Sequence, residues 1–331
     1  MKKLFIIVLF FYSSFVFAQP VVSSMSSKPG AFSRMGFGAR GMGMGNAMSA
    51  VIDGSLVAYY NPAIAIFQKD NSFQASYSIL SLDRSLNFLN FTKRFTFGPS
   101  FSPGDSSMPR GAGLSFGVIN SGVSNIDGRD QDGNKTGNLS TSENQFFVAF
   151  SKGFSRKLAI GLSVKFYYYH LYSQLSATGV GLDLGALYRL TENFNLSLVF
   201  TDLNSAYKWD TSPIYQEQGT TTNDAFPVLE KIGVSYTNKQ IGIIADVELE
   251  NSNAQTDILR AGIEYNIYDG FYLRTGIDQF NLRNSDYPVN PSFGFSYFTK
   301  LGKIIVGIDY AYVIEPYSPQ DRNIVGVNIK F

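Results

Sequence analysis

From residue 72 to the end of the chain, apolar residues alternate with small or polar ones in short segments separated by turn residues. A period of two is typical of β-strands whose faces meet different surroundings, and about ten residues allow a tilted strand to cross a bilayer. Fourteen segments follow this pattern, at 72–80, 85–94, 111–120, 143–151, 157–170, 176–188, 194–203, 229–237, 241–250, 256–266, 270–280, 291–298, 303–313 and 321–331. The pattern predicts an all-β fold, a 14-stranded antiparallel transmembrane β-barrel, with the even strand number of bacterial barrels.

The two faces of these segments differ in chemistry. In segment 157–170, Leu162 and Val164 share one face, and Ser163 and Lys165 share the other. A charge facing lipid costs about 2–4 kcal/mol at the bilayer midplane, so the charged face is expected to line the lumen. Six candidate lumen charges follow from this argument: Lys165, Asp183, Arg260, Glu264, Arg274 and Asp278. They are candidates for function, and mutual neutralisation in a narrow wet lumen is the alternative.

Connection lengths separate the barrel from a soluble sandwich or propeller, whose strands also alternate. Five connections are tight, at 153–156, 189–193, 238–240, 267–269 and 299–302, whereas 121–142 and 204–228 are long. Short periplasmic turns and long extracellular loops are typical of outer-membrane barrels. The stretch 95–110 is an exception, because it is long and falls on the predicted periplasmic side.

The two ends of the chain indicate export to the outer membrane. Lys2 and Lys3 precede an apolar run at 4–11, and the small-residue spacing before Ala18 is typical of a cleaved signal peptide over 1–18. The run is too short to cross a bilayer of about 30 Å as an anchor. The last strand ends on Phe331, which resembles the signal recognised by the barrel-assembly machinery, although a soluble edge strand can also end on an aromatic residue. The predicted location is the Gram-negative cell outer membrane, with cleavage near Ala18.

Composition agrees with this prediction. Phe (29), Tyr (20) and Gly (31) are abundant and charged residues make up only 16% of the chain, which suits strands with aromatic girdles. Cysteine is absent, which excludes disulfides and thiolate metal sites. The net charge of +1 and the lack of a basic block argue against nucleic-acid binding.

The segment before the first strand, residues 19–70, has a different texture. Five glycines between residues 36 and 45 precede a stretch of small residues that we expect to be helical, and Asn61-Pro62-Ala63 follows. Glycine permits close approach and sharp turns, and Pro62 fixes a bend before the first strand. The segment is therefore predicted to be a plug inside the barrel formed by residues 71–331; a flexible periplasmic tail is the alternative.

This block resembles the PorV/PorQ family of FadL-like barrels. The resemblance rests on Gly38-Ala39-Arg40-Gly41-Met42-Gly43, on Tyr59-Tyr60-Asn61-Pro62-Ala63 and on the hairpin at 181–204. It implies a plug whose motif residues are Arg40, Gly41, Gly43, Asn61, Pro62 and Ala63. It also implies a docking or shuttle role in type IX-like protein secretion, with secreted cargo proteins and a surface-attachment complex as partners.

Three motifs suggest other chemistry. The run 36–41 matches the dinucleotide fingerprint, but no strand precedes it and no βαβ unit follows. Asp127, Asp130 and Asp132 crowd one loop without the glutamate and glycine placement of an EF-hand, which favours a solvated acidic loop over a calcium site. His170, the single histidine, has the parity of lipid-facing residues and fits an interfacial aromatic belt better than a hydrolase site.

We therefore predict a non-enzymatic protein with no cofactor and no metal site, surrounded by outer-membrane lipid. The leading hypothesis is the secretion role, with 121–142 and 204–228 as the working surface, because loops on a rigid scaffold commonly carry recognition. The alternative is a FadL-like transport channel for hydrophobic small molecules, in which the plug gates the path. A purely structural envelope role is the third hypothesis.

Overall fold

The computed structural model describes residues 20–97, 111–172 and 175–331. The predicted signal peptide at 1–18, with its cleavage site, and most of the stretch 95–110 lie outside the described residues. None of the helices in the described part of the chain has the length and hydropathy needed to span a bilayer.

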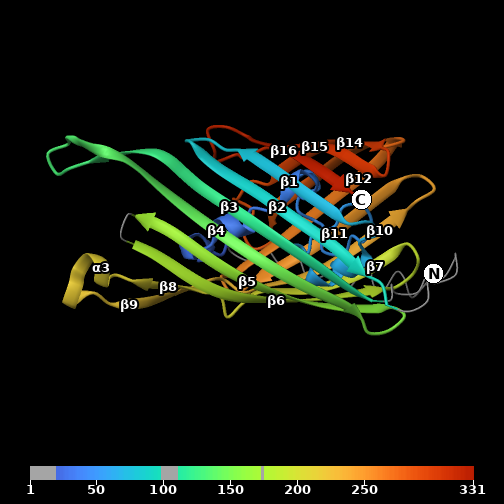
Figure 1. Ribbon diagram of the computed structural model, residues 1–331, viewed down its shortest axis with the longest axis horizontal. Helices are drawn as coiled ribbons and strands as arrows, with labels where there is room; N and C mark the ends of the chain where they lie inside the picture. The colour runs from blue at the N-terminus through green and yellow to red at the C-terminus, as the bar shows by residue number, and fades with distance from the viewer. Residues whose placement is uncertain (1–19, 98–110, 173–174) are drawn as a thin grey trace.

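Fourteen strands close into a single antiparallel barrel (Figure 1). They are β1 (Ser72–Ile79), β2 (Arg84–Phe95), β3 (Ala112–Arg129), β4 (Lys135–Gly153), β5 (Leu158–Tyr172), β6 (Leu175–Arg189), β7 (Phe194–Leu203), β10 (Leu229–Asn238), β11 (Ile243–Ser252), β12 (Thr256–Tyr268), β13 (Phe271–Asn281), β14 (Asn290–Leu301), β15 (Ile304–Val313) and β16 (Arg322–Lys330). Pairing of β1 with β16, from Ser72 opposite Lys330 to Ile79 opposite Asn323, joins the first and last strands and removes the free edges of the wall. The predicted fold class is confirmed.

The outer and inner faces are those expected from the alternation. In β5, Leu162 and Val164 are 43% and 46% exposed, whereas Ser163 and Lys165 are buried. The same contrast separates exposed Ile263 from its buried neighbour Glu264 in β12. The exposed apolar side chains form a belt around the barrel, which suits a hydrocarbon environment.

The prediction of a long loop at 121–142 is wrong. β3 and β4 continue as a two-stranded extension beyond the neighbouring strands, and the turn covers only residues 130–134 (Figure 1). The polar sequence suggested a loop. A hairpin surrounded by water, however, can pair its backbone without an apolar face, so its strands do not show the alternation. We call the end of the barrel with the short turns the turn end, and the opposite end, from which this extension projects, the outer end.

The stretch 204–228 is also more regular than predicted. It contains a second hairpin, β8 (Ala206–Asp210) and β9 (Thr221–Ala225), with two short helices between them, α3 (Ser212–Tyr215) and η4 (Gln216–Gln218). β8 pairs with the outer part of β6, where β7 has already ended. Two projecting hairpins therefore stand at the outer end (Figure 1).

Residues 20–70, which we call the plug, run through the barrel (Figure 1). The amide of Val21 donates to the carbonyl of Arg283 at the outer end, and the amide of Asn71 donates to Phe331 at the turn end. The plug contains η1 (Met25–Ser27), η2 (Ala31–Arg34), α2 (Gly38–Gly43) and η3 (Pro62–Phe67). The predicted helix after Gly45 is not found: the α-helix is formed by the glycine-rich run itself, and residues 46–61 form turns and irregular structure whose backbone bonds to the barrel wall.

Candidate functional site: the plugged lumen

Arg40 joins the plug to the barrel wall. Its Nε lies 2.8 Å from Glu264 Oε2 and its Nη2 lies 2.9 Å from Glu264 Oε1, a bidentate geometry between two buried side chains. Arg274 of β13 approaches the same carboxylate, with Nε 2.5 Å from Oε2. The remaining guanidinium nitrogen of Arg40 donates to the carbonyl of Ser55. One wall carboxylate thus holds two arginines, one from the plug and one from the wall.

Gly41, Gly43 and Gly45 of the plug differ in whether a side chain would fit in their place. A Cβ on Gly41 would lie 1.9 Å from the Tyr60 hydroxyl, so only glycine fits there. Gly45 has φ +60°, and its added Cβ would lie 2.5 Å from the backbone of Ile277 in β13. At Gly43, by contrast, a Cβ would make ordinary contacts at 3.5 Å or more. Close approach therefore requires glycine at two of these three positions.

Asn61-Pro62-Ala63 starts the second part of the plug. Asn61 caps η3 by accepting a 2.9 Å hydrogen bond from the amide of Ala63, and its Nδ2 donates to Ser49 and to Ala186 of β6. Pro62 occupies the first position of η3, where its lack of an amide proton costs nothing. The wall makes room with Gly185, because a Cβ there would lie 2.1 Å from Asn61 Oδ1. Pro62 therefore starts a short helix, and β1 begins only at Ser72.

A second ion-pair network covers the inner faces of β10 to β13. Arg260 Nε lies 2.6 Å from Asp278, and its Nη1 lies 3.0 Å from Glu250 and 3.4 Å from Glu248. Lys231 Nζ reaches the same two glutamates at 3.2 and 3.6 Å. The plug joins this network as well, because Asn46 Nδ2 donates to Asp278 Oδ2 at 2.8 Å.

The third network lies between β5, β6 and β7. Lys165 Nζ is 2.9 Å from Asp183 and 3.2 Å from Asp202, and the Tyr167 hydroxyl donates to Asp202. Asp202 has φ +60°, at the point where the β6–β7 register shifts. All six candidate lumen charges thus lie inside the barrel, buried and paired with opposite charges.

Aromatic side chains gather on the other side of the lumen. Phe37 of the plug packs between Phe88 of β2 and Phe147 of β4, with ring centroids 4.9 and 6.1 Å away. Farther toward the outer end, the Tyr167 ring lies 4.6 Å from that of Phe226, at the base of the β8–β9 hairpin. Trp209 continues the series at the hairpin itself. We call these residues, with Tyr59, Tyr169 and Tyr207, the aromatic column.

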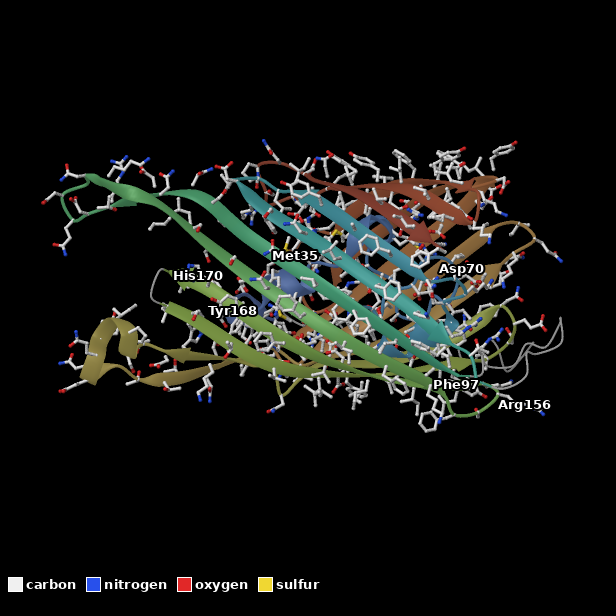
Figure 2. The ribbon with its side chains drawn as sticks, viewed as in Figure 1. Met35, Asp70, Phe97, Arg156, Tyr168 and His170 are labelled. Atoms are coloured by element: carbon white, nitrogen blue, oxygen red, sulfur yellow. The ribbon has the colours of Figure 1, made fainter. Side chains whose placement is uncertain are left out.

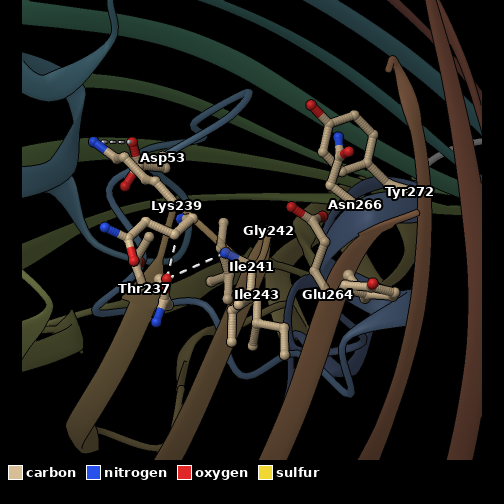
Figure 3. A pocket seen from close by; sticks show the side chains of 13 residues that line it. Asp53, Thr237, Lys239, Ile241, Gly242, Ile243, Glu264, Asn266 and Tyr272 are labelled. Carbon is tan, nitrogen blue, oxygen red and sulfur yellow. Dashed lines mark hydrogen bonds and ion pairs between the residues drawn. The ribbon is translucent and has the colours of Figure 1, made fainter. Parts of the chain in front are cut away.

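Two cavities of about 520 Å³ each open at the turn end, lined by residues of the plug and of the wall. They share Asp53, Glu264 and Tyr272, and Figure 3 shows one of them, with Lys239 reaching toward Asp53. Lys239 Nζ and Asp53 Oδ1 are 3.5 Å apart at the exposed mouth. Arg40 and Glu264 form part of the inner wall of the second cavity. The plug's ion pair therefore borders the space open to the turn end.

Other residues singled out in the sequence lie elsewhere. Phe331 is 55% exposed and stacks on Phe91 at the turn end, beside the β1–β16 seam. His170 and Tyr168 lie toward the outer end of β5, whereas Arg156 marks the turn end (Figure 2). The backbone amide and side chain of Asn134 lower the pKa of Asp130 by hydrogen bonding to its carboxylate. In the described part of the chain, no three acidic or histidine side chains form a cluster able to hold a metal ion.

Several lumen residues were missed by the sequence analysis. Glu248 and Glu250 alternate with exposed Val247 and Leu249, so the parity argument that placed Arg260 inside applies equally to them. Asp202 lies at a register shift, which no parity argument detects. The pairing of Arg40 with Glu264 joins residues 224 positions apart and has no local signal.

Comparisons with known proteins identify the fold. Neither a family model nor a curated protein matches the chain. Among solved structures, the Pseudomonas putida toluene transporter TodX has a TM-score of 0.56 at 15% identity, covering 89% of this chain and 96% of that one. The Ralstonia pickettii toluene transporter TbuX gives 0.55 at 14% (89% and 98% covered), and a Pseudomonas aeruginosa FadL homologue gives 0.51 at 11% (89% and 98%).

These similarities show a FadL-like fold, a closed outer-membrane-type barrel of fourteen strands with an N-terminal segment inside. Within that fold, the lumen has a charged side and an aromatic side, and the plug contacts both.

Proposed function

We propose that the protein is an outer-membrane channel for hydrophobic small molecules, with the plug as its gate. The observation that carries the proposal is the aromatic column, two groups of packed rings, one around Phe37 of the plug and one around Trp209 at the outer end, which belong to a single buried apolar cluster. Aromatic rings offer apolar molecules a desolvated surface, whereas the projecting hairpins and the mouth at the turn end are polar. The toluene transporters with the same fold favour this function over a secretion role.

In this proposal an ion pair and a hydrogen bond to the wall hold the plug in its closed position. The plug has no covalent link to the wall other than its junction with β1, so Arg40–Glu264 and Asn46–Asp278 provide specific, reversible attachments. Opening then requires the plug to release Glu264 and Asp278 and to move into the cavities at the turn end. The proposed function is transport without catalysis.

Uptake and binding measurements test this function. A deletion strain is expected to take up toluene or a long-chain fatty acid more slowly, with normal secretion, and the intact gene is expected to restore uptake. Trp209 is the single tryptophan, so ligand entering the aromatic column is expected to change the fluorescence of the purified protein. The Trp209→Phe variant serves as the blank. Normal uptake in the deletion strain together with unchanged fluorescence would rule the channel out.

The second candidate is the docking or shuttle role in type IX-like secretion. It is favoured by the PorV/PorQ-like block from Arg40 to Ala63 and by the two hairpins that project at the outer end. Pull-down of the native protein is expected to recover secreted cargo or an attachment complex in that case, and the deletion strain would lose secreted proteins. A purely structural envelope role predicts neither an uptake nor a secretion phenotype.

A further inference from the structure

A groove of about 690 Å³ lies at the outer end, on the outside of the barrel rather than in its lumen. Ile79, Ser85, Gly122 and Ser142 are direct partners across β1, β2, β3 and β4. Direct partners in neighbouring strands point to the same face of a sheet. Ile79 is 51% exposed, so this row faces outward. The volume falls within the range of about 300–1,000 Å³ that is typical of small-ligand sites.

The fold itself creates this groove. On one side, the turn between β1 and β2 stands out, with Leu82 and Asp83 both in the left-handed region at φ 61° and 53°. On the other side, β3 and β4 continue past the end of β2. Gly122 between them contributes no side chain, which leaves the floor of the groove open.

The lining has two chemical halves. Tyr77 and Ile79 are exposed members of the apolar belt, so the lower edge of the groove continues the lipid-facing surface. The hydroxyl groups of Ser85 and Ser142 lie in the same row as Ile79, and those of Ser124 and Ser140 lie two residues farther toward the outer end. Within the described residues, none of these four hydroxyls forms a hydrogen bond to another protein group.

The groove carries one charge of each sign. Asp83 and Arg84 are its charged lining residues. The Arg84 guanidinium donates to the carbonyl and to the hydroxyl of Ser81, at 3.1 and 3.2 Å, which fixes it at the edge of the groove. The groove therefore has no net charge, and most of its polar lining consists of hydroxyl groups.

We propose that this groove binds the sugar headgroup of an outer-leaflet glycolipid, with an acyl chain along Tyr77 and Ile79. Serine hydroxyls both donate to and accept from sugar hydroxyls, and a lining without net charge disfavours a headgroup recognised only by its phosphate. Continuity with the apolar belt selects a membrane lipid over a free sugar. The site is separate from the lumen and does not depend on the proposed transport.

Lipid binding to the purified, full-length protein tests the proposal. Glucosyl diacylglycerol and phosphatidylglycerol with the same acyl chains are added in detergent, and bound lipid is counted by native mass spectrometry. Two or more additional hydrogen bonds predict about tenfold more glucosyl lipid than phosphatidylglycerol on the wild-type protein. Equal binding of the two lipids would overturn the proposal.

Variants locate the site. The double variant Ser85→Phe/Ser142→Phe fills the groove and is expected to lose the bound glucosyl lipid. Its matched control is Ser176→Phe, because Ser142 pairs with His170 and His170 with Ser176, which places Ser176 at the same level on the outer face but outside the groove. Unchanged glucosyl lipid binding in the double variant, or an equal loss in the control, would contradict the assignment.

A second double variant tests the hydroxyl groups without adding bulky side chains that could disturb folding. Ser124→Ala/Ser140→Ala removes two hydroxyls without adding volume, so it is expected to lower the preference for the glucosyl lipid by at least about threefold while phosphatidylglycerol binding stays the same. If both lipids decline together, the groove recognises acyl chains only, and the proposed headgroup site is wrong.

Discussion

Two parts of the inner wall of this barrel contact the plug through different kinds of side chain. The wall of β2 to β4 meets the plug with Leu86, Phe88, Ile119 and Phe147, which are fully or almost fully buried. The wall of β10 to β15 meets it with charged residues arranged in ion-pair networks. Apolar packing is non-directional, whereas a bidentate ion pair sets position and orientation. The comparison indicates that the charged wall orients the plug. In the proposed channel, the aromatic wall is the surface that an apolar molecule would contact.

The largest effect is expected from removing the shared carboxylate of the charged wall. Glu264→Leu leaves Arg40 buried without its carboxylate and leaves Arg274 with only Asp309, at 3.7 Å, and we expect the free energy of unfolding to fall by about 3–5 kcal/mol. Urea unfolding in lipid vesicles measures this change. Arg40→Met should cost less, because Glu264 keeps Arg274. A loss below about 1 kcal/mol for Glu264→Leu would show that the network is not needed to hold the plug.

A charge on the outer face provides the next contrast. Val164 and Lys165 are neighbours in the middle of β5, one exposed to the belt and the other buried inside. Val164→Arg should destabilise the folded barrel in vesicles by about 2–4 kcal/mol, because its charge would face hydrocarbon. Val164→Leu is the control and should be close to neutral. Equal stability of the Arg and Leu variants would mean that this face does not lie in lipid.

Replacing an aromatic side chain of the β2–β4 wall should have a smaller effect on stability and a specific effect on ligand binding. Phe88→Leu removes a ring that packs on Phe37, with an expected cost of about 1–2 kcal/mol. The same variant should weaken the Trp209 fluorescence response to toluene, whereas Lys239→Met, at the exposed mouth, should leave the affinity of the column unchanged. A reversed pattern would assign the ligand to the mouth.

The smallest effect is expected at the mouth. Lys239 is 73% exposed and pairs with Asp53, so Lys239→Met should change the free energy of unfolding by less than about 1 kcal/mol. Measuring Lys239→Met and Arg40→Met under the same conditions compares the stability lost with an exposed ion pair and with a buried one. Equal losses in the two variants would remove the distinction between mouth and lumen.

The number of strands and the direction of their faces follow from the sequence alone. Each strand must separate lipid from water over about ten residues, and this requirement is local, so it leaves an alternation that is visible residue by residue. Lys165 and Arg274 could be placed inside on that basis. The same argument extends to Glu248 and Glu250, which alternate with apolar neighbours in the same way.

Only the folded chain shows how the lumen is organised. Arg40 meets Glu264, and Phe37 meets Phe88 and Phe147, because barrel closure brings distant segments to one axis; none of these pairs has a period or a spacing along the chain. The extensions of β3 and β4 and the β8–β9 hairpin could not be predicted from the sequence, for a related reason. Outside the bilayer both faces of a strand meet water, so the alternation that marks a strand disappears while its backbone hydrogen bonds remain.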